Sequence, residues 1–159
     1  MNRINVQLDA SHPAGYRIYI GSDILDRVGV ILNKGDWINR YIMISDSKVY
    51  GLHGQRVLET WRKMNLPIEG LEFPEGEKSK NMKTLLALVE KLTDLGADRH
   101  TALIALGGGV TGDLTGFLAS IYMRGVPFFQ IPTTLMAQVD SSLLILGAAY
   151  VLARLILRR

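Results

Sequence analysis

The sequence predicts an α/β domain in which helices flank a Rossmann-like, mostly parallel sheet and a β-hairpin opens the chain. Strand-like and helix-like segments alternate along the sequence, as in sheets built from strand–helix–strand units. The runs 41–44 and 101–106 are continuously apolar, which is typical of parallel strands covered on both faces. The chain has 159 residues, of which 48% are hydrophobic, enough for one domain with a substantial core.

The first half of the chain is expected to form a hairpin followed by alternating helices and strands. Apolar and polar residues alternate over 4–8 and again over 16–20, and the turn residues of 11–15 lie between them. This pattern predicts two antiparallel strands. The next expected elements are a helix over 24–32, a strand over 41–44, a helix over about 52–64 and a strand over 70–73.

The second half continues the alternation. A charged loop covers 74–80, and Ser79 is expected to cap the following helix. Apolar residues then recur at helical spacing between Met82 and Leu92, which predicts one buried helix face. A strand over 101–106, a helix from Val110 and a strand over 128–131 complete the pattern, and Pro132 ends the last strand.

A glycine-rich turn joins the apolar strand over 101–106 to the helix that follows it. Gly107, Gly109 and Gly112 match the spacing G-x-G-x-x-G. Glycine lets a phosphate approach the backbone, and the N–H groups and dipole of a helix N-terminus then face the anion. The turn therefore predicts a nucleotide pyrophosphate or a phosphorylated substrate as ligand. The alternative is a turn that only lets strand and helix pack closely, because the acidic residue that dinucleotide sites place about 20 positions on is absent.

Polar groups follow four of the predicted strands. The carboxyl ends of parallel strands meet at one edge of a sheet, where ligands bind in this fold class. The sequence therefore places a shared site at the residues that come directly after the strands, namely Asp46, Glu77, Gly108 and Thr133.

Composition excludes several other classes of function. The chain has no cysteine, and its histidines, His12, His53 and His100, are far apart, so no metal site is expected from this chain alone. The net charge of +3 comes from three arginines after position 142, and residues 1–142 carry 15 basic and 15 acidic side chains. Nucleic-acid binding is therefore not expected. No leader-like apolar run follows Met1, so a cytoplasmic location is expected.

Four blocks of sequence resemble one enzyme family in order and spacing. They are 107–117 (GGGVTGDLTGF), 122–125 (YMRG), 131–135 (IPTTL) and 138–142 (QVDSS), and the charged loop 74–80 is similar as well. On these residues the chain resembles 3-dehydroquinate synthase over about 3–142, the NAD-binding half of such enzymes. Iron- or zinc-dependent polyol dehydrogenases share the glycine turn but continue differently after Thr134. Antibiotic-pathway sugar phosphate cyclases are nearer, but they tend to replace Asp113.

The resemblance implies a particular chemistry. Enzymes of this family convert 3-deoxy-D-arabino-heptulosonate 7-phosphate to 3-dehydroquinate and phosphate, in the shikimate pathway of aromatic amino acid biosynthesis. Bound NAD oxidises one hydroxyl transiently, phosphate leaves, and the ketone is reduced again. A divalent metal, zinc or cobalt, polarises the oxidised centre. The resemblance also implies a sugar-phosphate substrate and a homodimer.

The family's cofactor-binding roles carry over onto residues that match its motifs. Asp46 and Lys48 match the stretch near the adenosine end, and Glu77 and Lys80 match the loop that holds a ribose and a phosphate. A helix-start cluster and a solvated charge run are the respective alternatives. The pyrophosphate turn and the hydroxyls on the cofactor are matched by Gly108, Gly109, Val110, Asp113, Thr133 and Thr134. Asp113 could instead serve only the helix dipole, and the threonines could be helix caps.

Two catalytic roles are implied in the same way. Asp140 matches an active-site carboxylate beside nicotinamide and substrate. Arg124 matches an arginine offered to the substrate phosphate of the neighbouring subunit, with a plain surface arginine as the alternative.

The chain departs from the family after Ser142. Leu146 stands where the family has a lysine, and the helical C-terminal domain with its metal ligands is missing, so we expect no metal ligands and no activity from this chain alone. A non-catalytic nucleotide-binding or scaffold module is the alternative. Residues 1–142 are expected to form the NAD-binding domain. The segment 143–159 has 13 apolar residues among 17. We expect it to form a helix over about 143–157 that packs on the sheet or on a second copy rather than entering a membrane.

Overall fold

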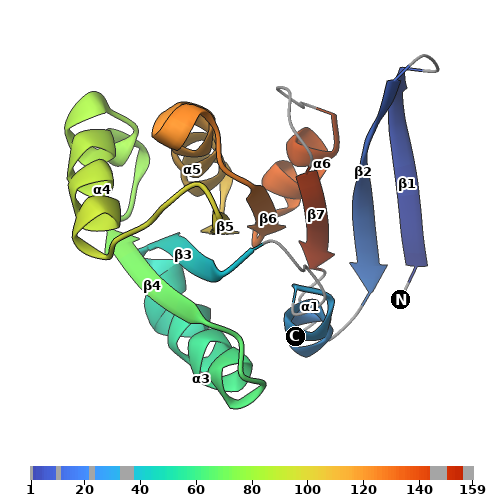
Figure 1. Ribbon diagram of the computed structural model, residues 1–159, viewed down its shortest axis with the longest axis horizontal. Helices are drawn as coiled ribbons and strands as arrows, with labels where there is room; N and C mark the ends of the chain where they lie inside the picture. The colour runs from blue at the N-terminus through green and yellow to red at the C-terminus, as the bar shows by residue number, and fades with distance from the viewer. Residues whose placement is uncertain (1, 10–11, 22–23, 33–37, 144–149, 156–159) are drawn as a thin grey trace.

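The computed structural model describes the whole chain except residues 1, 10–11, 22–23, 33–37, 144–149 and 156–159. Its centre is one seven-stranded sheet in the order β1-β2-β7-β6-β5-β3-β4 (Figure 1). β1 pairs antiparallel with β2, and every other neighbouring pair is parallel. The strands are β1 (Asn2–Asp9), β2 (His12–Gly21), β3 (Arg40–Asp46), β4 (Ile68–Phe73), β5 (Thr101–Gly107), β6 (Phe128–Pro132) and β7 (Tyr150–Leu155). The predicted fold class is confirmed.

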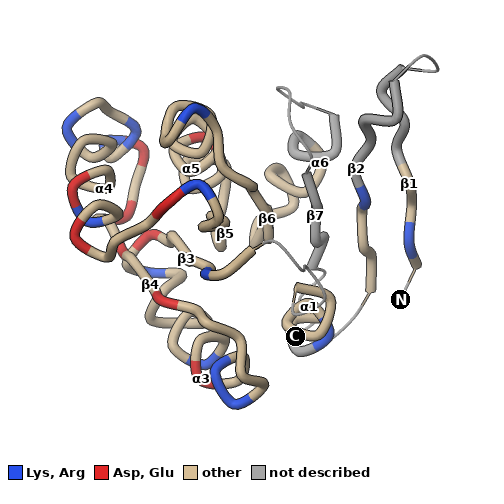
Figure 2. Tube along the Cα trace, in the orientation of Figure 1, with Lys and Arg blue, Asp and Glu red and all other residues tan. Residues whose placement is uncertain are grey.

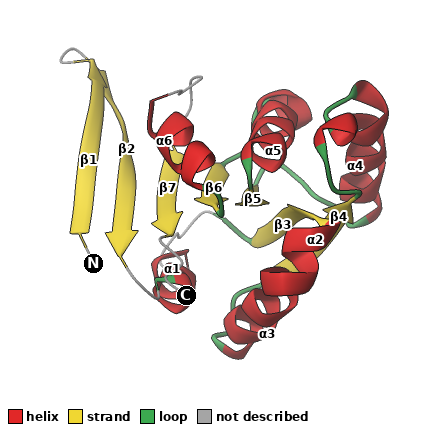
Figure 3. Ribbon diagram, turned by 180° about the vertical axis from the view of Figure 1, so that it is seen from behind, coloured by secondary structure: helices red, strands yellow, loops and turns green. Residues whose placement is uncertain are grey.

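Helices connect the parallel strands. They are α1 (Leu25–Leu32), α2 (Ser47–Val49), α3 (Gln55–Lys63), α4 (Met82–Asp94), α5 (Gly109–Ile121) and α6 (Leu135–Leu143). A π-helical stretch, η1 (Tyr50–Gly54), joins α2 to α3, and the 3₁₀ turns η2 (Glu77–Ser79) and η3 (Tyr122–Arg124) precede α4 and follow α5. Seen from behind, α3 lies below β3 and β4, whereas α4 and α5 lie above them (Figure 3).

The central strands separate two apolar cores. Along β3, Tyr41 and Met43 join the core beneath α1 and α3, and Ile42 and Ile44 join the core beneath α4 and α5. This alternation has the two-residue period of a strand, so successive side chains enter opposite cores. It explains why residues 41–44 and 102–106 are apolar at every position.

Three details of the secondary structure differ from the sequence predictions. The helix expected from about residue 52 begins at Ser47, because the Asp46 carboxylate accepts a hydrogen bond from the Val49 N–H at 3.0 Å and caps it. The residues expected as the hairpin loop, 12–15, belong to β2. Ser79 does not cap α4, since its hydroxyl donates to the Pro74 carbonyl at 2.5 Å, and Asn81 is the cap instead.

The expected helix over 143–157 is wrong for Tyr150–Leu155. These residues form β7, which lies between β2 and β6 and is parallel to both. Residues 144–149 and 156–157 of the predicted helix lie outside the described part of the chain. β7 joins the hairpin to the rest of the sheet, so the segment is an internal strand of the same sheet.

Charged residues lie mainly over the helical layers. Acidic and basic positions are intermixed along α3 and α4 (Figure 2). Over the described ranges, no helix is both long enough and apolar enough to cross a membrane.

Candidate functional site

The connectivity of the sheet creates a crevice at the carboxyl ends of β3 and β5. The helix after β3 packs into one core through Val57, Leu58 and Trp61 of α3. The helix after β5 packs into the opposite core through Leu114 and Leu118 of α5. Neighbouring strands whose helices leave to opposite faces define a topological switch point, which is where ligands bind in open α/β sheets.

The glycine turn lies on one side of this crevice, and its glycines have different structural roles. A Cβ on Gly107 would lie 2.4 Å from the Thr111 hydroxyl oxygen, and one on Gly112 would lie 2.5 Å from Nε2 of Gln130. These two glycines therefore permit close packing within the protein, as the packing interpretation of the turn proposed. Gly109 is exposed, and no atom in the described part of the chain lies within 4 Å of a Cβ built there. Its bare backbone is open to the outside.

The N-terminus of α5 differs from those of α2, α4 and α6. Asp46 caps α2, Asn81 caps α4, and the Thr134 hydroxyl accepts from the Ala137 N–H in the first turn of α6. Gly108 occupies the cap position of α5, and no described side chain bonds there. The free N–H groups of a 13-residue helix thus begin beside the open backbone of Gly109.

The end of β6 borders the same turn. The Thr133 N–H donates to the Gly107 carbonyl at 2.9 Å, and a Cβ on Gly108 would lie 3.3 Å from Cγ2 of Thr134. The structure therefore places the predicted Thr133 and Thr134 next to Gly108. The hydrogen bond from Ala137 also supports the alternative interpretation of Thr134 as a helix cap.

The charged loop after β4 reaches the first turns of α5. Nζ of Lys80 lies 2.6 Å from Oδ2 of Asp113, and both side chains are largely exposed. The hydrogen bond from Lys80 to Asp113, together with their charge attraction, raises the pKa of Lys80 above its ordinary value. Glu77 and Lys48 are exposed at the same edge, so the predicted loop and glycine turn meet in space.

The carboxyl end of β3 is tied to both neighbouring strands. The Ser45 hydroxyl donates to the Leu106 carbonyl at 2.7 Å, and the Ser47 hydroxyl accepts from the Glu75 N–H at 3.2 Å. The Thr111 hydroxyl donates to Oδ2 of Asp46 at 3.2 Å. Sequence reasoning named Asp46 but missed Ser45, Ser47 and Thr111. Ser45 could have been recognised because it is a polar residue directly after the apolar run 41–44.

Arg124 lies far from these residues. α5 starts at the carboxyl edge, and its 13 residues span about 20 Å, so η3 lies near the amino edge of the sheet. Met123 and Arg124 both adopt left-handed backbone angles, with φ of 48° and 69°. Within one chain, Arg124 cannot join the site that Gly108 and Lys80 form. Asp140 lies in α6, the helix that follows Thr134.

NAD fits the residues at this edge, whereas a metal does not. The uncapped α5 and the space at Gly109 suit a pyrophosphate. Among the described residues there is no group of three or more His, Asp or Glu side chains that could hold a metal ion.

Comparison with known proteins agrees with this geometry. Residues 70–148 match the family described as 3-dehydroquinate synthase N-terminal. The 3-dehydroquinate synthase of Lactococcus lactis subsp. cremoris (strain MG1363) is 46% identical over 127 residues, which cover 76% of this chain and 36% of that protein. The resemblance expected from the motifs is confirmed. The chain spans 36–38% of the length of the first curated relatives that it matches.

Solved structures show the same fold. A 2-deoxy-scyllo-inosose synthase complexed with carbaglucose-6-phosphate, NAD+ and Co2+ superposes with a TM-score of 0.81 at 28% identity, covering 96% of this chain and 44% of that one. The glycerol dehydrogenase of Schizosaccharomyces pombe superposes with a TM-score of 0.60 at 18% identity, covering 86% of this chain and 36% of that one. The second likeness is one of fold alone.

Proposed function

We propose that this chain, whose residues 70–148 belong to the 3-dehydroquinate synthase N-terminal family, is a nucleotide-binding domain that takes NAD at the carboxyl edge of its sheet. One observation carries the proposal. α5 begins without a described side-chain cap, beside a glycine whose surroundings are open. Free N–H groups at a helix start, next to backbone that a phosphate can approach, form a pyrophosphate site.

Each part of the cofactor has candidate partners. Backbone N–H groups of Gly108, Gly109 and Val110 would hold the pyrophosphate, and the Lys80 ammonium, fixed by Asp113, would add positive charge beside it. The adenosine end would lie toward Asp46, Lys48 and Glu77. The hydroxyls of Thr133 and Thr134, which follow β6, would border the nicotinamide half, and Asp140 is proposed beside it on the family resemblance alone.

For a chain of the relatives' full length we propose the family's reaction, from 3-deoxy-D-arabino-heptulosonate 7-phosphate to 3-dehydroquinate and phosphate. Bound NAD supplies reversible hydride acceptance, and this domain binds and orients it. We derive no step through a metal, because the described residues do not fit one. The 159 residues span 36–38% of the relatives' length, so we expect them alone to release no phosphate above background.

Arg124 motivates a proposed homodimer. The arginine is exposed on a left-handed turn and lies about a helix length from the nucleotide site of its own chain. A second copy would let it serve a substrate phosphate in the partner's site. The cytoplasmic location is likewise proposed, on the family resemblance.

Calorimetry with NAD and with ADP-ribose tests the binding proposal. We expect dissociation constants of about 0.1–1 mM, or roughly −4 to −5.5 kcal/mol, because these residues build only part of a cofactor pocket. A phosphate-release assay with the sugar-phosphate substrate, run with and without zinc, accompanies it. Absence of heat at several millimolar NAD, with the protein folded, would refute the proposal.

A non-catalytic nucleotide-binding module is the second candidate. Leu146 favours it, since the family's lysine at that position contacts phosphate and cofactor. The two candidates agree on binding and differ on chemistry. In a chain of the relatives' full length, phosphate release that is lost on Asp140→Ala would exclude the second candidate.

A further inference from the structure

We infer that Thr111 is a positioning residue for the nucleotide site, acting through its hydrogen bond to Asp46. The inference rests on the proposed function. Thr111 does not reach the outer surface of the turn, since it is 1% exposed. Its role would be to hold the start of α5 against the end of β3, so that the free N–H groups of the helix keep their direction.

The Thr111 side chain lies directly beneath the glycine turn. Its Oγ1, Cβ and Cγ2 atoms lie 2.4, 2.6 and 3.0 Å from the place that a Cβ on Gly107 would take. The absence of a side chain at Gly107 therefore makes room for this threonine. Threonine in a helix chooses between two χ1 rotamers, and the hydrogen bond to Asp46 selects the one that directs the hydroxyl toward β3.

The hydrogen bond of the Thr111 hydroxyl spans the crevice between the start of α5 and the end of β3. The hydroxyl donates to Oδ2 of Asp46 at 3.2 Å, while Oδ1 of the same carboxylate accepts from the Val49 N–H at 3.0 Å. One carboxylate thus connects the first turn of α5 with the first turn of α2. These two helices depart toward opposite faces of the sheet, so the bond ties together elements that the topology sends apart.

Loss of the hydroxyl would act on binding in two ways. The first turn of α5 would lose its tie to β3, and the N–H groups would spend less time in the geometry that a pyrophosphate needs. The Asp46 carboxylate would lose a donor and keep its negative charge near a site for an anion. Both effects weaken nucleotide binding, and neither requires contact between Thr111 and the ligand.

The opposite edge of the sheet offers a matched control. Thr101 is also 1% exposed, and its hydroxyl donates to Oδ1 of Asp98 at 3.1 Å. Thr101 stands at the start of β5, and Thr111 follows the end of the same strand. Thr101→Val and Thr111→Val therefore each remove a threonine–aspartate hydrogen bond, but only Thr111 adjoins the proposed site. Thr101→Val also removes the bond that its hydroxyl accepts from the Asp98 N–H at 2.9 Å, so it is the more disruptive of the two for local structure.

The experiment compares Thr111→Val, Thr111→Ser and Thr101→Val in the full 159-residue chain, by NAD calorimetry and thermal unfolding. We expect Thr111→Val to weaken NAD binding about five- to tenfold, the effect of losing part of a charge-assisted hydrogen bond. Thr111→Ser keeps the hydroxyl and should bind within about twofold of the parent chain, and so should Thr101→Val, even if its unfolding midpoint falls as far.

A double-mutant cycle completes the test. In an Asp46→Ala background, Thr111→Val should weaken NAD binding by less than about twofold, because the partner of its hydroxyl is already gone. Parent-like binding by Thr111→Val, or equal losses in Thr111→Val and Thr101→Val, would overturn the inference and leave the proposed function intact. If the parent chain itself gives no NAD binding, the proposed function fails and the inference falls with it.

Discussion

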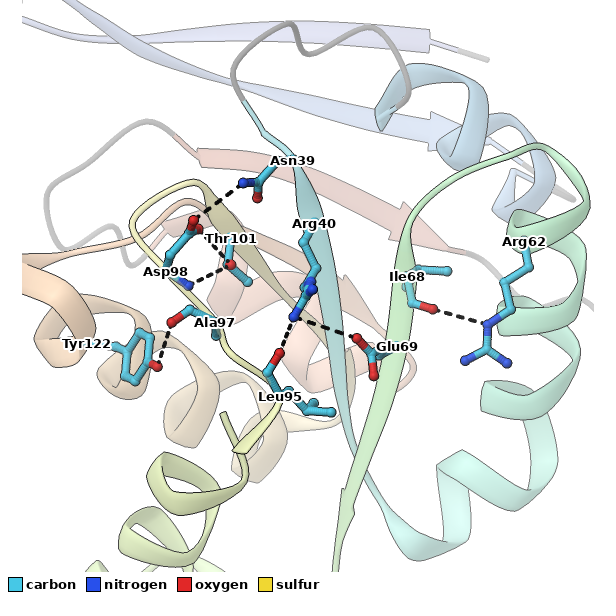
Figure 4. Close-up of polar contacts among 10 residues, drawn as sticks. All are labelled: Asn39, Arg40, Arg62, Ile68, Glu69, Leu95, Ala97, Asp98, Thr101 and Tyr122. Carbon is cyan, nitrogen blue, oxygen red and sulfur yellow. Dashed lines mark hydrogen bonds and ion pairs between the residues drawn. The ribbon is translucent and has the colours of Figure 1, made fainter. Parts of the chain in front are cut away.

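The two edges of the parallel sheet use their polar groups differently. At the amino edge, the side chains of Asp98, Thr101 and Tyr122 are hydrogen-bonded to nearby backbone or to one another (Figure 4). At the carboxyl edge, side chains cap α2, α4 and α6, but α5 begins without a described cap. One edge is therefore closed by internal bonds, while at the other edge the start of α5 has no described side-chain cap and can meet a ligand.

Asp98 shows how the amino edge is closed. Its carboxylate accepts from the Thr101 hydroxyl at 3.1 Å and from Nδ2 of Asn39 at 3.4 Å (Figure 4). It also accepts from the His100 N–H at 2.8 Å. Nearby, the Tyr122 hydroxyl donates to the Ala97 carbonyl at 3.0 Å, and Arg40 bonds the Leu95 carbonyl. These contacts hold the loop between α4 and β5 in place.

A valine at Gly109 is the strongest test of this contrast. The side chain would stand where the phosphate must approach, so NAD binding should fall by more than about tenfold. No described atom lies within 4 Å of the new Cβ, and the unfolding midpoint should therefore shift by no more than about 2 °C. Calorimetry and thermal unfolding on the same sample check both parts. Retained affinity would place the pyrophosphate elsewhere.

A valine at Gly96 should lower stability and leave NAD affinity unchanged, the reverse of a valine at Gly109. Gly96 follows the C-cap of α4 with φ of +66°, and a β-branched residue is strained in that conformation. We expect a loss of about 1–2 kcal/mol in the free energy of unfolding, with NAD affinity unchanged within twofold. Urea unfolding gives the first quantity and calorimetry the second. A large loss of affinity would show that the two edges are not independent.

Removal of the Lys80 ammonium should have a smaller effect. Lys80→Ala should weaken NAD binding about threefold to tenfold at low salt, and the difference should shrink as salt rises, because the group is exposed. Glu69→Gln is the matched control, since it removes a charge 3.9 Å from Arg40 at the amino edge and should leave affinity unchanged. Equal affinities for Lys80→Ala and the parent chain would remove Lys80 from the site.

The smallest expected effect is a difference between the two edges in how stability depends on pH. The His100 N–H, bonded to Asp98, lowers the pKa of that carboxyl below 3.8, so its contribution is present above pH 3.8 and is lost as the pH falls through the lowered value. The Lys80 pKa is raised by Asp113, so that contribution is complete below pH 10.5 and is lost as the pH rises through the raised value. Urea unfolding should show Asp98→Asn flattening only the acid limb, and Lys80→Ala only the alkaline limb. If Asp98→Asn instead flattened the alkaline limb and Lys80→Ala the acid limb, the roles given to these two residues would be contradicted.

Local patterns were enough to predict most of the fold. Continuous apolar runs placed β3 and β5, because both faces of these strands are covered. β7 was missed because the apolar residues of 150–155 also fit a helical stripe. Only pairing with β2 and β6, which lie far away in the sequence, makes this segment a strand.

The site was predictable where it depends on local geometry. The glycine turn was recognised because one short segment carries both the strand end and the helix start. The bond between Thr111 and Asp46 was not foreseen, since these residues lie 65 positions apart and meet only when β3 and β5 pair. The helix-cap role of Asp46, the alternative that its position at a helix start offers, is confirmed, and its role as a cofactor ligand stays a prediction.

The central claim is that the carboxyl edge binds NAD and the amino edge does not. Titration of the ¹⁵N-labelled chain with NAD, followed by amide chemical shifts, tests this most directly. We expect the largest chemical-shift changes at Gly108, Gly109 and Thr133, and we expect the amide shifts of Asp98 and Thr101 to stay unchanged. Unchanged amides at Gly108 and Thr133 in several millimolar NAD, or the largest shifts at Asp98 and Thr101, would contradict it.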